Sequence, residues 1–329
     1  MKIIHVSKAL ALTVGFIIAP GLLAQRGEHA VHAKAVAKSA NCYDADDTSK
    51  LRLWESSAPG SVGNDLCRDV PYMQVFRPSD GSQVPGSAIL IIPGGGYDRL
   101  TDAAEQAPVA EYFARTFHVT AFVLYYRLVQ SDGTYRYPIP MWDGQRAVKL
   151  IRARASQLGI DPNRIALFGF SAGGHLASTL TLHSATDFGL PQHDAVDRES
   201  GRPDLLGLGY PVISMDPMDV PPSGSYKNLL RGFVGIELKK LQTYLSGEKN
   251  VTERTPPVFL FESKDDAVIS PENSELFVAA LKSHGIPTDA HIFDHGKHGA
   301  GLATEEPEES AWPAMFGRWL AAQHFLSGR

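Results

Sequence analysis

The sequence predicts an α/β fold with a mostly parallel central sheet and helices on both faces. Strand-like and helix-like segments alternate along the chain, and the strand-like segments are mostly short apolar runs. The 329 residues are 43% hydrophobic and 20% charged, a globular composition. Strands that are apolar on both sides are typical of a parallel sheet covered by two layers of helices. We expect one such domain over residues 46–329, because single α/β domains of this length are common.

Short apolar runs mark the expected strands. They are rich in β-branched and aromatic residues, as is typical of strands buried on both faces. These runs cover residues 87–93, 119–127, 163–170, 204–213, 256–262 and 289–294.

Amphipathic stretches between these runs mark the expected helices, since their apolar residues recur at three- and four-residue spacing. They cover residues 103–116, 143–159, 172–183, 273–285 and about 309–325. The segment near 215–251 breaks the alternation with a proline-rich start and a Lys/Leu-rich helical piece. We interpret it as a lid-like insertion beside the strand ends. The alternative is that this segment is a loosely packed loop without a function.

The first residues predict an export signal. Lys2 and Lys8 precede an apolar run that ends in small residues near Ala24. This pattern is typical of a cleaved signal peptide, here residues 1–24, and we expect a flexible mature N-terminus over residues 25–45. The alternative is a membrane anchor, but the run is short for a span of about 20 apolar residues. We therefore expect a periplasmic or secreted protein without a stable membrane span once mature.

Charge and cysteine content limit the classes of partner. The formal net charge is −5 and no dense block of Lys or Arg follows the leader. Nucleic acid and anionic membrane surfaces are therefore not expected as partners. The only two cysteines, Cys42 and Cys67, precede the core. In an oxidising compartment they favour a disulfide, with two unpaired thiols as the alternative.

A candidate nucleophile lies at the end of a predicted strand. Residues 169–175 read Gly-Phe-Ser-Ala-Gly-Gly-His and place Ser171 in the pattern Gly-x-Ser-x-Gly between a strand and a helix. Such a sharp turn needs glycines on each side of the serine, because a Cβ there would clash. The following helix points backbone N–H groups at the site. We therefore expect Ser171 to act as a nucleophile, with the N–H of Ala172 binding an oxyanion.

A serine hydroxyl needs a base at neutral pH, and the chain provides one downstream. His298 follows the last predicted strand, and Asp265 and Asp266 follow the strand before it. Neighbouring parallel strands end at the same edge of a sheet, so these side chains can converge on Ser171. In the resulting mechanism His298 removes the proton of Ser171 and an aspartate orients the imidazole.

A glycine-rich loop supplies the second half of an expected oxyanion hole. Residues 93–97 read Pro-Gly-Gly-Gly-Tyr and leave the strand 87–93. Backbone N–H groups of glycines approach a ligand closely, so we expect Gly95 or Gly96 to form a donor pair with Ala172.

These motifs together resemble those of the α/β-hydrolase superfamily, specifically bacterial acetyl-esterase and acetyl-xylan-esterase-like carbohydrate esterases. The matching stretches are PGGGY, DGQRAVKLIRARASQLGIDPNRIALFGFSAGGHLAS, GYPVIS, TPPVFLFESKDDAVISPENS and HGAGL. They cover most of the chain from about Leu51 to its end. The resemblance implies an α/β-hydrolase fold and a serine esterase that removes short acyl groups, in particular acetyl, from carbohydrate esters such as acetylated xylan fragments.

The resemblance also selects among the candidate residues. The family's acid lies six residues before the Glu of ENS, which implies Asp266 rather than Asp265. The family's histidine belongs to an HG pair, which implies His298 rather than His295. The chain departs from the family where Glu262 replaces a usual His and Ser270 replaces a usual Pro, so the setting of Asp266 differs from the family pattern.

Other functions remain as alternatives. One is a general short-chain carboxylesterase or lipase with a non-carbohydrate substrate, and another is a non-catalytic binding protein of the same fold. His291, His295 and His298 have a spacing found in metal sites, but no Cys or carboxylate set completes one, so no metal and no cofactor is expected. His175 is interpreted as a packed core residue.

Overall fold

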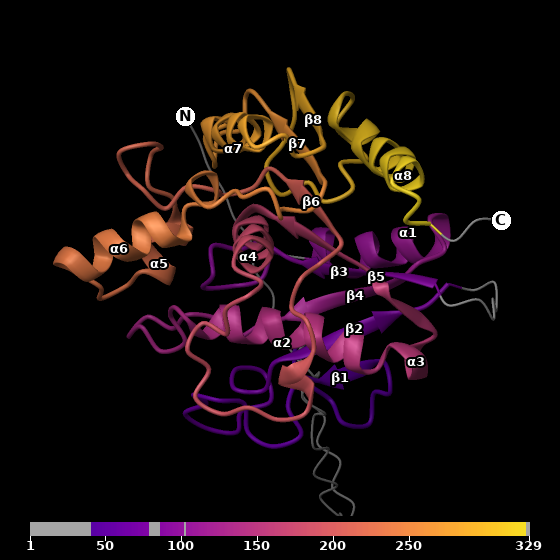
Figure 1. Ribbon diagram of the computed structural model, residues 1–329, viewed down its shortest axis with the longest axis vertical. Helices are drawn as coiled ribbons and strands as arrows, with labels where there is room; N and C mark the ends of the chain where they lie inside the picture. Colours follow the sequence, from indigo (N-terminus) through magenta and orange to yellow (C-terminus); the bar gives the residue numbers. More distant parts are fainter. Residues whose placement is uncertain (1–40, 79–85, 102, 327–329) are drawn as a thin grey trace, which may run out of the picture. The chain divides into compact units, whose positions relative to one another are not determined.

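The computed structural model describes residues 41–78, 86–101 and 103–326 (Figure 1). These residues belong to one compact unit, Ser39–Arg329. The signal peptide expected over residues 1–24 and residues 25–40 of the expected flexible terminus lie outside the described residues.

One sheet of eight strands organises the described part of the chain, in the order β1-β2-β4-β3-β5-β6-β7-β8. The strands are β1 (Lys50–Arg52), β2 (Tyr72–Phe76), β3 (Gly86–Ile92), β4 (Thr120–Tyr125), β5 (Ile160–Phe170), β6 (Leu205–Gly209), β7 (Val258–Ser263) and β8 (Thr288–Phe293). β2 pairs antiparallel with β1 and β4, and all other neighbours are parallel. The carboxyl ends of β3 to β8 therefore meet at one edge, where ligands bind in open α/β sheets.

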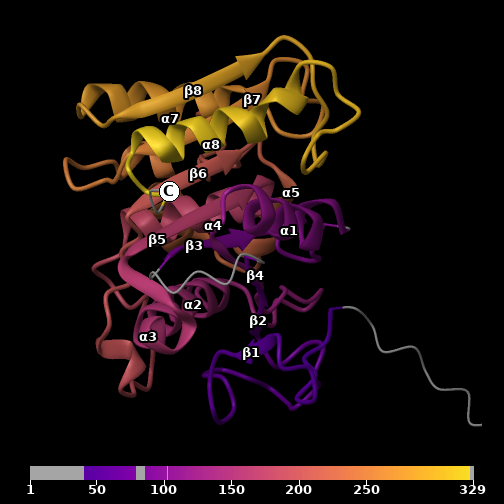
Figure 2. The ribbon, with the colours of Figure 1, turned by 90° about the vertical axis from the view of Figure 1, so that its right-hand side faces the viewer.

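Helices cover both faces of this sheet. They are α1 (Ala107–Thr116), α2 (Ile139–Ala153), α3 (Ala155–Leu158), α4 (Ser171–Leu182), α5 (Gly224–Leu229), α6 (Gly235–Leu245), α7 (Glu272–Ser283) and α8 (Trp312–Ala322), with short 3-10 turns that include η1 (Ala103–Glu105), η3 (Gly247–Lys249) and η4 (Glu309–Ala311). Residues of α1 and α8 form one apolar core with the sheet, and residues of α2, α4 and α7 form the other. Figure 2 looks onto the face that carries α1 and α8.

The predicted α/β architecture with a mostly parallel sheet is confirmed, although several element boundaries differ. The antiparallel edge strands β1 and β2 were not predicted, because β1 has three residues and both are only partly buried. The helix predicted over residues 143–159 begins at Ile139 and ends at Ala153, with α3 following. Pro140 is compatible with this earlier start, because the first turn of a helix needs no N–H from its proline.

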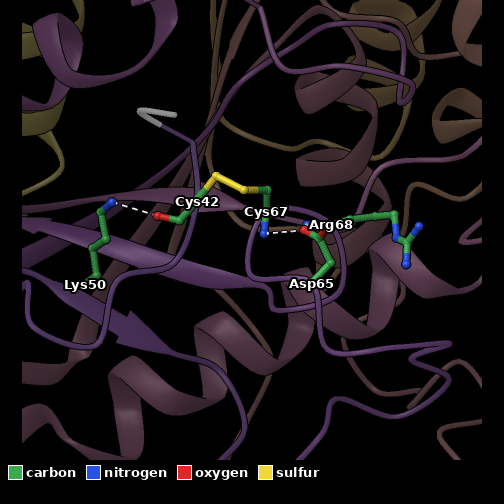
Figure 3. Close-up of a disulfide and its surroundings, with 5 residues drawn as sticks. All are labelled: Cys42, Lys50, Asp65, Cys67 and Arg68. Carbon is green, nitrogen blue, oxygen red and sulfur yellow. Dashed lines mark hydrogen bonds between the residues drawn. A yellow bond between two sulfur atoms is a disulfide. The ribbon is translucent and has the colours of Figure 1, made fainter. Parts of the chain in front are cut away.

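A disulfide joins Cys42 to Cys67 beside the first strand (Figure 3). The ammonium group of Lys50 donates a hydrogen bond of 2.8 Å to the carbonyl of Cys42. The N–H of Cys67 donates another of 2.8 Å to Asp65. The disulfide that the sequence favoured is confirmed. It attaches Cys42, near the end of the stretch 25–45 that we expected to be flexible, to Cys67.

The insertion near 215–251 contains α5, α6 and η3. It extends away from the sheet on the side of α4 and α7 (Figure 1). Three apolar side chains in it are largely exposed: Met218, Val234 and Ile236. In the part of the chain that the structure describes, no helix combines the length and the hydropathy needed to cross a membrane.

Candidate active site

The turn between β5 and α4 presents Ser171 at the carboxyl edge of the sheet. β5 ends at Phe170 and α4 begins at Ser171, whose φ of +51° lies in the left-handed region. A Cβ at Gly169 would overlap the carbonyl of Gly173, and a Cβ at Gly173 would overlap that of Ile92. Only glycine fits at both positions, so the Gly-x-Ser-x-Gly pattern is a requirement of this turn.

Three side chains that lie far apart in the sequence form one hydrogen-bonded chain. Nε2 of His298 lies 2.9 Å from Oγ of Ser171. Nδ1 of His298 lies 2.6 Å from Oδ2 of Asp266. The side chain of His298 is 13% exposed and that of Asp266 only 1%. A hydroxyl, an imidazole and a carboxylate in this order are the arrangement that activates a serine for acyl transfer.

Asp266 is held as a carboxylate. Burial alone would raise its pKa, but the hydrogen bond from His298 and the backbone N–H groups of Val268 and Ile269 outweigh burial. Its pKa therefore lies below the usual value. Asp265 instead contacts His295, with 2.9 Å between Oδ2 and Nδ1, and both of these side chains are exposed. The structure thus brings Asp266, and not Asp265, to His298.

The glycine loop after β3 lies against the serine. A Cβ at Gly94 would come within 2.8 Å of the Cβ of Ser171. The N–H of Gly94 is used by Glu105, whose Oε2 accepts it at 2.7 Å. Gly95 and Gly96 have φ of +113° and +65°, a region that favours glycine. With Gly94 engaged, Gly95 and Gly96 are the loop donors left to act beside the N–H of Ala172, at the start of α4.

The insertion contacts this glycine loop directly. Nδ2 of Asn228, on α5, donates a hydrogen bond of 2.9 Å to the carbonyl of Gly96. Asn228 in turn accepts a bond of 2.9 Å from Arg231. The segment interpreted as lid-like therefore holds the backbone of the loop at Gly96, two residues after the glycine that Glu105 binds.

Carboxylates also hold the loop that carries His298. Four consecutive backbone N–H groups, those of residues 294 to 297, donate to carboxylates at 2.8 to 3.2 Å. Glu308 accepts the first two, Asp265 the third and Glu309 the fourth. Burial raises the pKa of Glu309 to about 7. The histidine loop is therefore fixed by side chains of the acid loop and of the segment before α8.

The three histidines with metal-like spacing point to different partners. His291 pairs with Asp289, His295 with Asp265 and His298 with Asp266. Among the described residues no group of three or more His, Cys, Asp or Glu side chains is placed to hold a metal ion.

Comparison with known proteins identifies the family of this site. The model of the BD-FAE family matches residues 73–281, more than half of the chain. The chain belongs to the BD-FAE family. The matched BD-FAE region contains Ser171, Asp266 and the glycine loop, and it ends before His298.

Relatives of this BD-FAE chain include named hydrolases. The endo-1,4-beta-xylanase B of Butyrivibrio fibrisolvens is 34% identical over 72% of this chain and 36% of its own length. An acetylxylan esterase of Xylanibacter ruminicola is 30% identical over 75% of this chain and 47% of its own length. The chain thus spans less than half of the length of these two curated relatives.

A solved structure matches over nearly its whole length. It is the acetyl ester-xyloside bifunctional hydrolase from Caldicellulosiruptor lactoaceticus, 37% identical, with a TM-score of 0.74 over 85% of this chain and 97% of that chain. A carboxylesterase from Lactobacillus plantarum, 24% identical with a TM-score of 0.65 over 83% of this chain and 98% of that chain, shares the fold. The α/β-hydrolase fold predicted from the sequence is confirmed.

Sequence reasoning missed several buried or loop-holding carboxylates of this BD-FAE site. Glu105, Glu308 and Glu309 contact the loops that flank Ser171, yet no motif marks them. The acidic run at residues 305–309 was the available signal. Glu262, which departs from the family pattern, accepts bonds from the N–H of Ser263 and from a hydroxyl of α7.

Proposed function

We propose that the protein is a serine esterase that removes short acyl groups, in particular acetyl, from carbohydrate esters such as acetylated xylan fragments. The observation that carries this proposal is the hydrogen-bonded chain from Ser171 through His298 to Asp266. A small acylated saccharide is its substrate.

Acylation begins at Oγ of Ser171. His298 accepts the hydroxyl proton at Nε2 while Oγ attacks the ester carbonyl carbon, and Asp266 stabilises the imidazolium that forms. The tetrahedral intermediate carries its negative charge on oxygen, where the N–H groups of Ala172 and of Gly95 or Gly96 bind it. His298 then returns the proton to the leaving sugar oxygen, and an acyl-enzyme remains on Ser171.

Deacylation reverses these roles with water as the nucleophile. Water donates a proton to Nε2 of His298 as its oxygen attacks the acyl carbon, and the same donors bind the second oxyanion. Collapse of this intermediate returns the proton to Oγ of Ser171 and releases the carboxylic acid.

The substrate class is supported by the names of the relatives. One is an acetylxylan esterase, one is a xylanase, and the structural relative is described as acting on an acetyl ester and a xyloside. Other relatives are named only as carboxylic ester hydrolases, among them a probable one of Mycobacterium tuberculosis that is 23% identical. A general short-chain carboxylesterase is therefore the second candidate.

The experiment measures acetate release from acetylated xylo-oligosaccharides and hydrolysis of p-nitrophenyl acetate by the full chain and by Ser171→Ala. We expect both activities in the full chain and a loss in kcat on the order of 10⁴ to 10⁶ in the variant. Ser156→Ala, which changes an exposed serine of α3, is the matched control and keeps full activity.

Each result has a definite meaning. Release of acetate by the full chain alone supports the carbohydrate esterase. Hydrolysis of p-nitrophenyl acetate without acetate release favours the general carboxylesterase. No activity on either ester, or equal activity of Ser171→Ala, contradicts the serine esterase itself.

We further propose that the protein is exported with cleavage near Ala24. The leader pattern supports this, and the Cys42–Cys67 disulfide fits an oxidising compartment. The test is N-terminal sequencing of protein recovered outside the cytoplasm. A first residue close to position 25 supports export, and recovery of the uncleaved chain in the cytoplasm alone contradicts it.

A further inference from the structure

A buried carboxylate lies behind the proposed oxyanion loop. Glu105, in the 3-10 turn η1, has no exposed surface. Its Oε2 accepts the N–H of Gly94 at 2.7 Å, and its Oε1 accepts the hydroxyl of Tyr210 at 3.0 Å. The mechanism above does not use this ionisable group.

Tyr210 extends the contact to the histidine loop. Its hydroxyl oxygen accepts the N–H of Gly301 at 3.1 Å, so its own proton is free to be donated to Glu105. The ring of Tyr210 lies against the imidazole of His298, with 4.8 Å between the centroids. The carbonyl of Gly301 is held in turn by the indole N–H of Trp312 at 2.9 Å.

Glu105 therefore connects the two loops that flank Ser171. On one side it fixes Gly94, which touches the serine, and through Tyr210 it fixes the chain three residues after His298. The turn η1 itself packs on the histidine loop, since a Cβ at Gly301 would overlap the carbonyl of Ala104. A shift of the glycine loop would break the bond from Gly94 to Glu105, and a shift of the histidine loop would break the bond from Gly301 to Tyr210.

The charge of Glu105 is costly where it lies. Burial raises the pKa of Glu105 above its usual value, and the bonds from Gly94 and Tyr210 and the charge of His298 only partly offset this rise. A glutamine would accept the Gly94 N–H without the cost of burying a carboxylate. A carboxylate is advantageous here because a positive imidazolium forms on His298 during acyl transfer.

We infer that Glu105 is a positioning residue of the esterase site, which aims the N–H groups of Gly95 and Gly96 at the oxyanion and supports charged His298 through Tyr210. This inference rests on the proposed function. Glu105 stabilises the tetrahedral state, in which both the oxyanion and the imidazolium exist, and it does not affect substrate binding.

The test compares Glu105→Gln with the full chain in hydrolysis of p-nitrophenyl acetate and in binding of 1-butaneboronic acid, which forms a tetrahedral adduct on an active serine. We expect kcat and the affinity for the boronic acid each to fall by about tenfold. We expect KM to change by less than about twofold. Glu111→Gln, which neutralises an exposed carboxylate of α1, is the matched control and behaves as the full chain.

Tyr210→Phe provides a second variant that leaves the carboxylate in place. It removes the connection from Glu105 to the histidine loop, and we expect kcat to fall with KM unchanged. Thermal melts of all variants accompany the kinetics. If Glu105→Gln fails to fold, Tyr210→Phe tests the inference instead: a lower kcat with an unchanged KM supports it, and a parallel change in both contradicts it.

The outcomes separate the two proposals. Folded variants with the kcat and boronic acid affinity of the full chain overturn the inference about Glu105 and leave the esterase intact. A parallel change in kcat and KM with a lowered melting temperature also overturns it, since that marks a structural role alone. A full chain that neither hydrolyses the ester nor binds the boronic acid overturns the proposed function, and the role of Glu105 falls with it.

Discussion

The hydroxyl of Tyr97 lies 2.6 Å from Nδ1 of His175, and both side chains are fully buried. Nε2 of His175 lies 2.8 Å from the carbonyl of Leu245, which can only accept, so Nε2 carries the proton and Nδ1 accepts from Tyr97. Burial lowers the pKa of His175 to about 4, so the imidazole is neutral. This neutral histidine of α4 connects the glycine loop to the end of α6 in the insertion.

Tyr97→Phe should therefore destabilise the protein. The variant leaves Nδ1 of a buried imidazole without a donor, which costs about 1 to 3 kcal/mol. Urea unfolding measures this change, with Tyr112→Phe on the half-buried side of α1 as the control. A decrease in the free energy of unfolding of less than about 0.5 kcal/mol would mean that the hydrogen bond between Tyr97 and His175 contributes little to stability.

The two adjacent aspartates should differ sharply in their effect on activity. Asp266→Asn removes the carboxylate that orients His298, and we expect kcat to fall by about 10⁴. Asp265→Asn disturbs only the exposed contact with His295 and one backbone bond of the histidine loop, so we expect a loss of less than about tenfold. Steady-state kinetics on p-nitrophenyl acetate compare them, and a greater loss in Asp265→Asn would reverse the assignment of the acid.

Glu262 should make stability fall as pH rises. Burial raises its pKa from 4.5 to about 9. Between these values the folded protein keeps a proton that the unfolded chain has released, so the contribution of Glu262 is complete below pH 4.5 and is lost toward pH 9. Glu262→Gln stays neutral and keeps partners in Ser263 and Ser274. We expect it to exceed the native chain in free energy of unfolding at pH 9 by on the order of a few kcal/mol.

Denaturant unfolding from pH 5 to 9 measures the effect of Glu262. Exposed Glu275, on α7, supplies the control variant Glu275→Gln, which should follow the native curve. Identical pH dependence in Glu262→Gln and the native chain would show that Glu262 is ionised in the folded state.

The disulfide should stabilise the protein, because the loop that it closes restricts the unfolded chain. Cys42 and Cys67 are separated by 25 positions, and a loop of this size corresponds to about 3 kcal/mol. The double variant Cys42→Ser/Cys67→Ser should unfold at lower denaturant, and reductant should lower the midpoint of the native chain alone. A reductant effect of equal size in the double variant would assign the loss to another cause.

The local sequence pattern was sufficient to predict the parallel core and the turn at Ser171. β3 and the second half of β5 are continuous apolar runs, and the glycines around Ser171 are dictated by backbone overlap, so both are visible in the sequence. The convergence of Asp266 and His298 on Ser171 followed from the rule that parallel strands end at one edge. The choice of Asp266 over Asp265 needed the family resemblance, since both aspartates follow the same strand.

The remaining site residues depend on contacts across the chain that no local pattern encodes. Glu105 meets Tyr210 across 105 positions, and although Tyr210 lies in the matching stretch GYPVIS, nothing in that stretch marks its contact with Glu105. Glu308 and Glu309 belong to a short acidic run, and their partners are backbone N–H groups of the histidine loop. When the partners of a carboxylate are backbone N–H groups, no particular partner side chain in the sequence can reveal the contact.

The insertion is one continuous stretch between β6 and β7, and it contains none of the proposed catalytic residues. Two of its contacts reach the site: Asn228 binds the carbonyl of Gly96, and Leu245 binds His175. A single recombination event in the gene can therefore replace this stretch while the acyl-transfer residues are inherited unchanged. Variants that keep these two contacts and the buried core residues of the stretch, such as Leu229 and Leu230, can vary its exposed residues without changing the acyl-transfer residues.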